Sequence, residues 1–273
     1  MERFMKNSLV TVVITTKNEE LVIEDLLKSI KKQSYSPIET IIVDNSSIDK
    51  TVEIAKKYTK YVFTKGPERS SQRNYGAKKA KGKYLLFLDA DMELLPGVIE
   101  ECVKKVQNLG VGGIIIPEKS VGIGFWAKVK AFERSFYVGY DITDAARFFD
   151  KSVFLKLSGF DENITGPEDW DLSMRVQKKY GIATAESLIY HNEEQLSLWK
   201  LMKKKYYYGK KTRVYLSKNK ISSVSPQTIF FLRKAFYKKT DKIIAHPFLS
   251  LAMIYMLSLE LIAGALGYYG RKL

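Results

Sequence analysis

Hydrophobic and polar positions follow two alternating periodicities along the first 190 residues of this 273-residue chain. Short apolar runs rich in β-branched residues have the length of buried strands, and the segments between them repeat apolar residues at helical spacing. The expected strands cover residues 9–15, 38–43, 61–64, 84–88, 111–116, 145–150 and 182–190. The expected helices cover residues 19–33, 50–58, 69–80, 96–109, 123–138 and 168–180. Strands that alternate with helices predict βαβ units and a mostly parallel α/β sheet flanked by helices.

The pattern changes after His191, where the chain becomes helical, basic and rich in aromatic residues. Residues 247–269 then form an apolar run with one charge, Glu260, whose length matches a bilayer-spanning helix of about 20 residues. A buried C-terminal helix is the alternative, and an acid at the bilayer centre costs about 2.5–3.5 kcal/mol. We expect three parts, namely an α/β domain (1–195), a basic amphipathic helical segment (196–245) and a membrane-contacting or membrane-spanning helix (246–273).

The formal net charge of +15 is concentrated in the basic segment. Residues 199–242 contain 14 Lys and Arg and one acid, Asp241, so this stretch carries +13. Such a segment indicates an anionic partner, either phospholipid or nucleic acid. The adjoining apolar run favours a membrane, and nucleic acid is not expected as a partner. The positive-inside rule predicts that the basic segment and the α/β domain lie on the cytoplasmic face.

Polar clusters follow three of the expected strands, at the end where open α/β sheets bind ligands. They are TTKNEE (15–20), DNSSIDKT (44–51) and DADM (89–92), and the basic helix RSSQRNYGAKKAKGK (69–83) leads into the third. Each cluster alone is compatible with a turn or a helix cap. Asp89 and Asp91, however, end one buried strand together, and two carboxylates this close favour a cation between them. Both are hard oxygen ligands suited to Mg²⁺ or Mn²⁺.

In this order along the chain, the motifs resemble those of the family 2 glycosyltransferases, which are inverting enzymes of the GT-A fold. The resemblance covers residues 9–190 and includes LSGFDENITGPEDWDLSMR (157–175). It implies a Rossmann-like GT-A sheet, a nucleotide-sugar donor and a divalent metal, Mn²⁺ or Mg²⁺, that neutralises the departing diphosphate.

The resemblance also implies roles for the residues around the donor. Asp44 matches the carboxylate that contacts the nucleobase, and a carboxylate accepts an N–H from uracil or guanine alike, so UDP and GDP both stay open. Glu19 and Thr15 match the opening motif near the ribose, and Arg73 matches a cation near the donor, with a structural salt bridge as its alternative. Asp89 then faces the ribose and the metal.

The remaining implied roles concern the metal and the acceptor. Asp91 is the principal metal ligand, and His191 either completes the metal site or is a structural histidine. Asp169 matches the base that takes the proton from an acceptor hydroxyl, and Glu168 shapes the acceptor or sugar pocket. The basic tail is not expected to belong to this catalytic core.

These implications together predict a membrane-associated inverting glycosyltransferase with a lipid-linked or membrane-bound hydroxyl acceptor. A polyprenyl-phosphate sugar synthase is an alternative, although its phosphate acceptor needs no strong base. A non-catalytic, nucleotide-sugar-binding membrane protein is another. A sugar nucleotidyltransferase is disfavoured, because TTKNEE has no glycine for a phosphate-binding loop.

Overall fold

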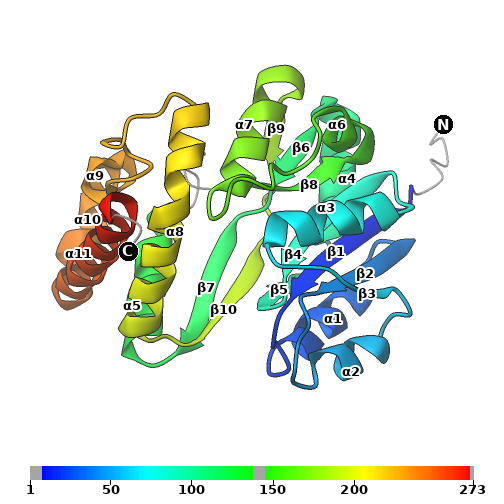
Figure 1. The fold of residues 1–273 in the computed structure, drawn as a ribbon, viewed down its shortest axis with the longest axis horizontal. Helices are drawn as coiled ribbons and strands as arrows, with labels where there is room; N and C mark the ends of the chain where they lie inside the picture. Colours follow the sequence, from blue (N-terminus) through cyan, green and yellow to red (C-terminus); the bar gives the residue numbers. More distant parts are fainter. Residues whose placement is uncertain (1–7, 138–144, 271–273) are drawn as a thin grey trace. The chain divides into compact units, whose positions relative to one another are not determined.

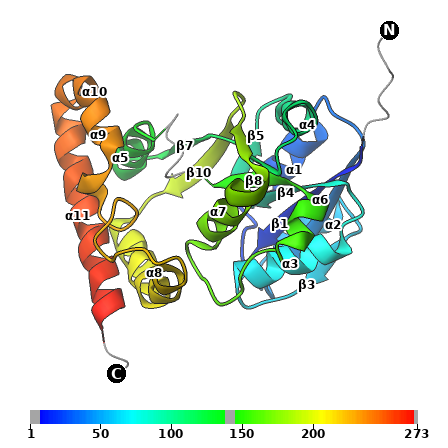
Figure 2. The same cartoon turned by 90° about the horizontal axis from the view of Figure 1, so that it is seen from above.

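The computed structural model describes residues 8–137 and 145–270, and Figures 1 and 2 draw the chain from two sides. These residues fall into two compact units. The first unit comprises residues 8–117, 145–162 and 172–190, and the second comprises residues 118–137, 163–171 and 191–270. The boundaries expected at residues 195 and 245 separate parts with different expected functions. The two compact units do not test these boundaries, which stay a prediction.

The first unit contains a seven-stranded sheet in the order β3-β2-β1-β4-β8-β6-β9. Its strands are β1 (Val10–Thr16), β2 (Ile38–Asp44), β3 (Val62–Thr64), β4 (Tyr84–Asp89), β6 (Gly113–Ile115), β8 (Ala146–Asp150) and β9 (Ile182–Thr184). The pairs β1–β2, β1–β4, β2–β3 and β6–β9 are parallel, whereas β8 runs antiparallel to both of its neighbours. The expected mostly parallel mixed sheet is therefore confirmed.

Helices cover both faces of this sheet. They are α1 (Ile23–Lys31), α2 (Thr51–Lys56), α3 (Arg69–Lys79), α4 (Val98–Leu109), α6 (Lys151–Lys156) and α7 (Glu168–Tyr180). Successive side chains of a strand point to opposite faces. Val12 and Ile14 accordingly join a hydrophobic cluster with α1, α2 and α4, whereas Val13 joins a second cluster with α3, α6 and α7. Apolar side chains on both faces explain why these strands are near-continuous hydrophobic runs.

A glycine brings α3 close to the sheet. A Cβ at Gly76 would collide with the side chain of Val13, so only glycine allows α3 to lie this near β1. The approach lets the Gln72 side-chain amide donate to the Val43 carbonyl at 2.7 Å and to the Thr16 carbonyl at 3.2 Å. The start of α3 is thereby attached to the carboxyl ends of β1 and β2.

Two expected elements differ from the structure. The strand expected at 182–190 is interrupted, with β9 followed by β10 (Ile189–Gln195). Between them the backbone N–H groups of Glu186 and Ser187 donate to Glu101 of α4 at 2.6 and 2.9 Å, which draws the chain away from the sheet. The helix expected at 123–138 is α5 (Phe125–Arg134), and residue 138 lies outside the described residues.

The second unit is mainly helical. It contains β7 (Glu118–Ile123), which pairs with β10, and the helices α5, α8 (Leu198–Lys218), α9 (Lys234–Lys238), α10 (Thr240–Ala245) and α11 (Pro247–Tyr269). Both views draw α8 and α11 side by side (Figures 1 and 2). Among the described residues, α11 is the one helix long and apolar enough to cross a membrane.

Candidate active site

Two of the predicted donor residues end strands β2 and β4, which flank β1 in the sheet of the first unit. Asp44 is the last residue of β2 and pairs in register with Thr16 of β1, while Asp89 is the last residue of β4 and pairs with Thr15. Both aspartates therefore lie at the same edge of the sheet, on either side of the end of β1. This is the carboxyl edge at which open α/β sheets bind ligands.

Arginines surround Asp89. Arg73 of α3 is 2% exposed, and its Nη2 lies 2.8 Å from Asp89 Oδ1. Arg147 of β8 and Arg69 of α3 lie 3.6 and 3.8 Å from Oδ2. Burial alone would raise the pKa of Asp89, but the three guanidinium charges outweigh burial and hold this pKa well below 3.8.

The four charged groups of this arginine cluster (Arg69, Arg73, Arg147 and Asp89) carry three positive charges and one negative charge, which is an excess of two. Arg69 is 37% exposed and can reach a ligand in solvent. Guanidinium groups bind phosphate oxygens through paired hydrogen bonds. The cluster is therefore suited to an anion such as a diphosphate. Arg147 lies outside the polar motifs, and no sequence pattern marked it.

Asp44 organises the loops that follow β1 and β2. The buried carboxylate accepts hydrogen bonds from Thr16 Oγ1 at 2.7 Å, from the Ser47 backbone N–H at 2.7 Å and from Ser47 Oγ at 2.6 Å. The Asn18 N–H donates to Ser47 Oγ at 2.8 Å, and the Glu19 N–H donates to Thr51 Oγ1 at 2.7 Å. The two polar motifs thus form one interlinked surface. A carboxylate offers about four acceptor sites, so Asp44 retains capacity for a ligand N–H.

The predicted metal residues do not gather into one group. Asp91 is half-buried in the turn between β4 and β5 (Met92–Leu94), two residues after Asp89. His191 of β10 places its Nδ1 3.0 Å from Glu118 Oε2 of β7, and Arg134 binds the same oxygen at 2.8 Å. Within residues 8–137 and 145–270, no three His, Cys, Asp or Glu side chains are arranged to hold a metal ion. The metal roles of Asp89, Asp91 and His191 stay predictions.

The predicted acceptor residues open α7. Glu168, Asp169 and Asp171 all lie in its first turn, where the helix dipole favours negative charge. Glu168 is 1% exposed and Asp171 is fully buried, whereas Asp169 is half-buried and accepts a hydrogen bond from the Trp170 N–H at 2.8 Å. Gly166 precedes this turn with φ +102°, a conformation that favours glycine.

The basic helix α8 contacts one of these acids. Lys218 Nζ lies 3.0 Å from Asp171 Oδ1, and Asn219 Nδ2 donates to the same oxygen at 3.2 Å. Burial and the negative charges of Asp171 and Asp169 raise the pKa of Tyr215 to about 12. No sequence signal could have found these partners, because they lie more than 40 residues from the acids and belong to a uniformly basic helix.

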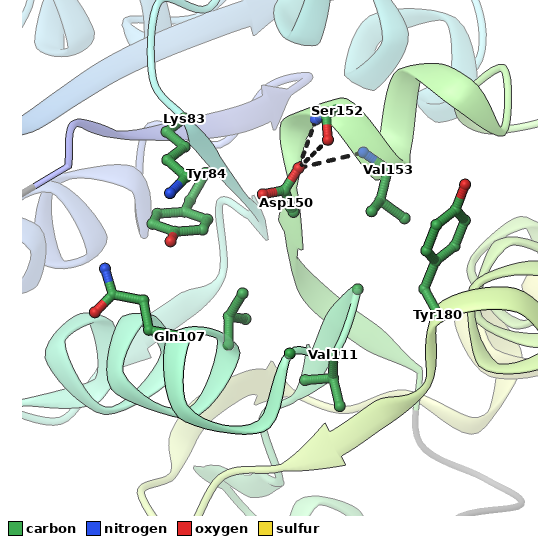
Figure 3. A pocket seen from close by; sticks show the side chains of 11 residues that line it. Lys83, Tyr84, Gln107, Val111, Asp150, Ser152, Val153 and Tyr180 are labelled. Atoms are coloured by element: carbon green, nitrogen blue, oxygen red, sulfur yellow. Dashed lines mark hydrogen bonds between the residues drawn. The ribbon is translucent and has the colours of Figure 1, made fainter.

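A pocket of about 450 Å³ lies at the opposite edge of the sheet (Figure 3). Its lining includes Lys83 and Tyr84 at the start of β4, Asp150 at the end of β8, and Tyr180. β4 has six residues, so at about 3.3 Å per residue this pocket lies about 17 Å from Asp89. None of the predicted site residues lines it.

Comparisons with known proteins agree with this architecture. An uncharacterized glycosyltransferase of Methanocaldococcus jannaschii is 28% identical over 265 residues, which cover 85% of this chain and 89% of that protein. The GalNAc(5)-diNAcBac-PP-undecaprenol beta-1,3-glucosyltransferase of Campylobacter jejuni is 28% identical over 108 residues, or 36% of this chain and 34% of that protein.

A mannosyltransferase from Pyrobaculum calidifontis, solved in complex with GDP-Man and Mn²⁺, has a similar fold. The TM-score is 0.58 at 17% identity, over 96% of this chain and 76% of that one. The expected GT-A fold is thereby confirmed. The model of the family described as Glycosyl transferase family 2 matches residues 11–155, more than half of the chain, which confirms the expected glycosyltransferase activity, so the chain belongs to glycosyl transferase family 2.

Proposed function

We propose that this glycosyltransferase moves a sugar from a UDP- or GDP-sugar to a hydroxyl of a lipid-linked or membrane-bound acceptor, with inversion at the anomeric carbon. The observation that carries the donor assignment is the arginine cluster, which brings three guanidinium groups to the carboxyl edge of the sheet. The mannosyltransferase with a similar fold was solved with a nucleotide-sugar. The Campylobacter relative is named for an undecaprenol-linked substrate.

The donor would lie along the edge formed by β1, β2 and β4. Asp44 accepts an N–H of the nucleobase, Thr15 and Glu19 lie near the ribose, and Arg73 and Arg69 contact the diphosphate. The hydrogen-bonded loops after β1 and β2 support this assignment, because they hold Asp44 in one orientation before any ligand binds.

Asp91 and Asp89 would hold the divalent metal, Mn²⁺ or Mg²⁺. Their carboxylate oxygens are the hard donors that such ions accept, and Asp89 ends β4 while Asp91 lies in the turn that follows, so these two carboxylates fit the ion at the proposed diphosphate position. When bound, the metal neutralises charge on the departing diphosphate. His191 is a third candidate ligand, and its contact with Glu118 fits the orienting role that carboxylates have toward ligating histidines.

Acceptor activation is assigned to α7. Asp169 removes the proton from the acceptor hydroxyl as its oxygen attacks the anomeric carbon, and Glu168 shapes the pocket. Asp171 is a poorer base, because Lys218 and Asn219 already hold its carboxylate and it is fully buried. The half-buried position of Asp169 leaves it accessible to an acceptor.

The experiment that tests this proposal begins with the donor. Thermal-shift measurements against UDP, GDP and their sugars with Mn²⁺ identify it, because a ligand that binds only the folded state raises the melting temperature. Single-turnover transfer and calorimetric donor affinity are then measured for Asp169→Asn. We expect the transfer rate to fall by about 10²–10⁴, since a general base is lost, while the dissociation constant of the donor hardly changes.

Asp25→Asn is the matched control, because Asp25 is also an acid in the first turn of a helix, α1, and is exposed. It should transfer sugar at the wild-type rate. Transfer by Asp169→Asn near the wild-type rate would remove Asp169 as the base, and transfer to a polyprenyl phosphate by that variant would favour the phosphate-acceptor alternative. Binding of a nucleotide-sugar without transfer to any acceptor would favour the non-catalytic alternative.

A further inference from the structure

The apolar helix α11 has two faces with different surroundings. One stripe is buried in the second unit and consists of Ser250, Met253, Met256, Leu257, Glu260, Ala263 and Gly267. The other stripe, the outer face, consists of Phe248, Leu251, Tyr255, Ile262, Leu266 and Tyr269, which are 53–85% exposed. Their spacing of three, four or seven residues places them along one side of a helix. An exposed helix face without a charged residue is unusual for a protein surrounded by water on all sides.

Close backbone contacts hold α11 along α8. A Cβ at Gly209 of α8 would collide with the Gly264 carbonyl oxygen, and a Cβ at Gly267 would collide with the Tyr206 carbonyl oxygen. Near the end of α11, Arg213 Nη2 donates to the Tyr268 carbonyl at 3.2 Å. The two helices therefore pack together from Tyr206 to Arg213 of α8 and over the C-terminal half of α11.

The single charged residue of α11, Glu260, faces α8 and α5. Glu260 lies 3.0 Å from Lys205 of α8 and 3.4 Å from Lys130 of α5. Burial alone would raise the pKa of Glu260, but the two lysine charges hold it at about 2, so the carboxylate is ionised and neutralised inside the second unit. The one residue that argued against lipid contact is thus absent from the outer face.

Helix α8 cannot enter the hydrocarbon core of a bilayer. It contains eight Lys and Arg and no acid, and seven of these residues are exposed, namely Lys200, Lys203, Lys204, Lys210, Lys211, Arg213 and Lys218. Lys203 lies over the Trp199 ring at 5.1 Å, and Lys210 lies over the Tyr206 ring at 4.6 Å. Basic and aromatic side chains in this mixture are typical of the headgroup region. Because α11 packs along α8, α11 cannot span the bilayer without drawing these charges inside.

We propose that α11 lies in the plane of an anionic membrane, with its outer face among the acyl chains and α8 at the headgroups, and does not cross the bilayer. The charge complementarity supports lipid over a second copy of the chain. Residues 199–242 carry +13, so two copies brought together at this surface would repel, whereas anionic headgroups attract it. The inference deepens the proposed membrane-bound acceptor, but lipid binding can be measured without any sugar transfer.

The test is flotation of the full-length protein with preformed vesicles of phosphatidylcholine, with and without phosphatidylglycerol. The variant Leu251→Asp/Leu266→Asp places charges on the outer face at residues that are 67% and 60% exposed, so the core is left intact. Leu109→Asp is the matched control, because Leu109 is 59% exposed at the end of α4 in the first unit. Circular dichroism and melting temperature verify that all three proteins are folded.

We expect the wild type and Leu109→Asp to float with phosphatidylglycerol vesicles, to bind more weakly at high salt because the headgroup attraction is screened, and to be released by alkaline carbonate. The double variant should lose this binding. Equal flotation of the double variant would overturn the role of the outer face, and resistance to alkaline carbonate would overturn the in-plane orientation in favour of a spanning helix. Light scattering that shows a dimer lost in the double variant, without vesicle binding by the wild type, would assign the face to a second copy.

Discussion

Asp89 and Glu260 are both largely buried carboxylates that pair with cations. The numbers of positive and negative groups around them differ. The side chain of Asp89 is 17% exposed and that of Glu260 is 7% exposed. Three arginines face the single carboxylate of Asp89. Around Glu260, Lys130 also binds Glu133 at 2.9 Å, and Arg233 lies 3.9 Å from Glu133, so three cations face two carboxylates.

The difference separates an anion site from a structural anchor. Around Asp89, an excess of two positive charges sits on guanidinium groups at the carboxyl ends of strands, which is where a diphosphate would bind. Around Glu260, the charges link three helices, α5, α8 and α11, inside the second unit. The pKa values of both carboxylates are lowered, yet the two groups have different uses, and the arrangement of the surrounding charges distinguishes them.

The largest effect is expected for Asp89→Asn, which removes one charge of the arginine cluster and nearly preserves its shape. Breaking a buried ion pair on one side typically costs about 3–5 kcal/mol, so the free energy of unfolding should fall by that order. The excess positive charge rises from two to three, and pyrophosphate should therefore raise the melting temperature of this variant more than that of the wild type. Urea unfolding and thermal shift in metal-free buffer measure both quantities.

Glu260→Gln is the control for that comparison, because pyrophosphate should affect its melting temperature as it affects the wild type. A larger pyrophosphate effect on the wild type than on Asp89→Asn would contradict the anion-site interpretation.

A second effect concerns the pH dependence of Glu260. Its pKa falls from 4.5 to about 2 on folding, so ionisation contributes stability that is present above about pH 4.5 and is lost as pH falls toward 2. At about 1.4 kcal/mol per pKa unit, the contribution is about 3 kcal/mol. Glu260→Gln should therefore be less stable than the wild type by that order at pH 7, and the gap should close between pH 4.5 and 2. A gap that stays constant over this range would show that ionisation of Glu260 is not its cause.

The smallest effect is expected at Asp150, a carboxylate that caps a helix. It accepts hydrogen bonds from the backbone N–H groups of Ser152 at 2.8 Å and Val153 at 3.3 Å at the start of α6. Loss of such a cap costs about 0.5–2 kcal/mol, so Asp150→Ala should fall in this range, whereas Asp150→Asn should be almost neutral. Urea unfolding measures both. If Asp150→Ala lowered the free energy of unfolding as much as Asp89→Asn does, the expected difference between a helix cap and a buried ion pair would be contradicted.

Much of the first unit could be predicted because its information is local. The apolar runs that end at Thr16, Asp44 and Asp89 are buried on both faces, so their lengths defined the strands and their ends defined the candidate donor edge. The alternation of strands and helices along the chain then predicted the mostly parallel sheet. The interruption between β9 and β10 could not be predicted, since it depends on hydrogen bonds to Glu101, about 85 residues away.

A sequence pattern could also not predict which residues contact the candidate site residues. Arg147 reaches Asp89 only because the antiparallel strand β8 lies beside β4. Lys218 and Tyr215 meet the acids of α7 only because α8 packs against that turn. These contacts join segments more than 40 residues apart, and a local pattern carries no information about them.

The sequence by itself determined the alternation of strands and helices, the polar ends of the donor strands, the acidic start of α7, and an apolar helix with one charge. Each follows from the period and chemistry of neighbouring residues. Only the tertiary structure decided that arginines surround Asp89 and which face of α11 is covered. A uniformly apolar helix has no periodicity to mark its buried side, so the contacts of Gly264, Gly267 and Glu260 with α8 and α5 make that choice.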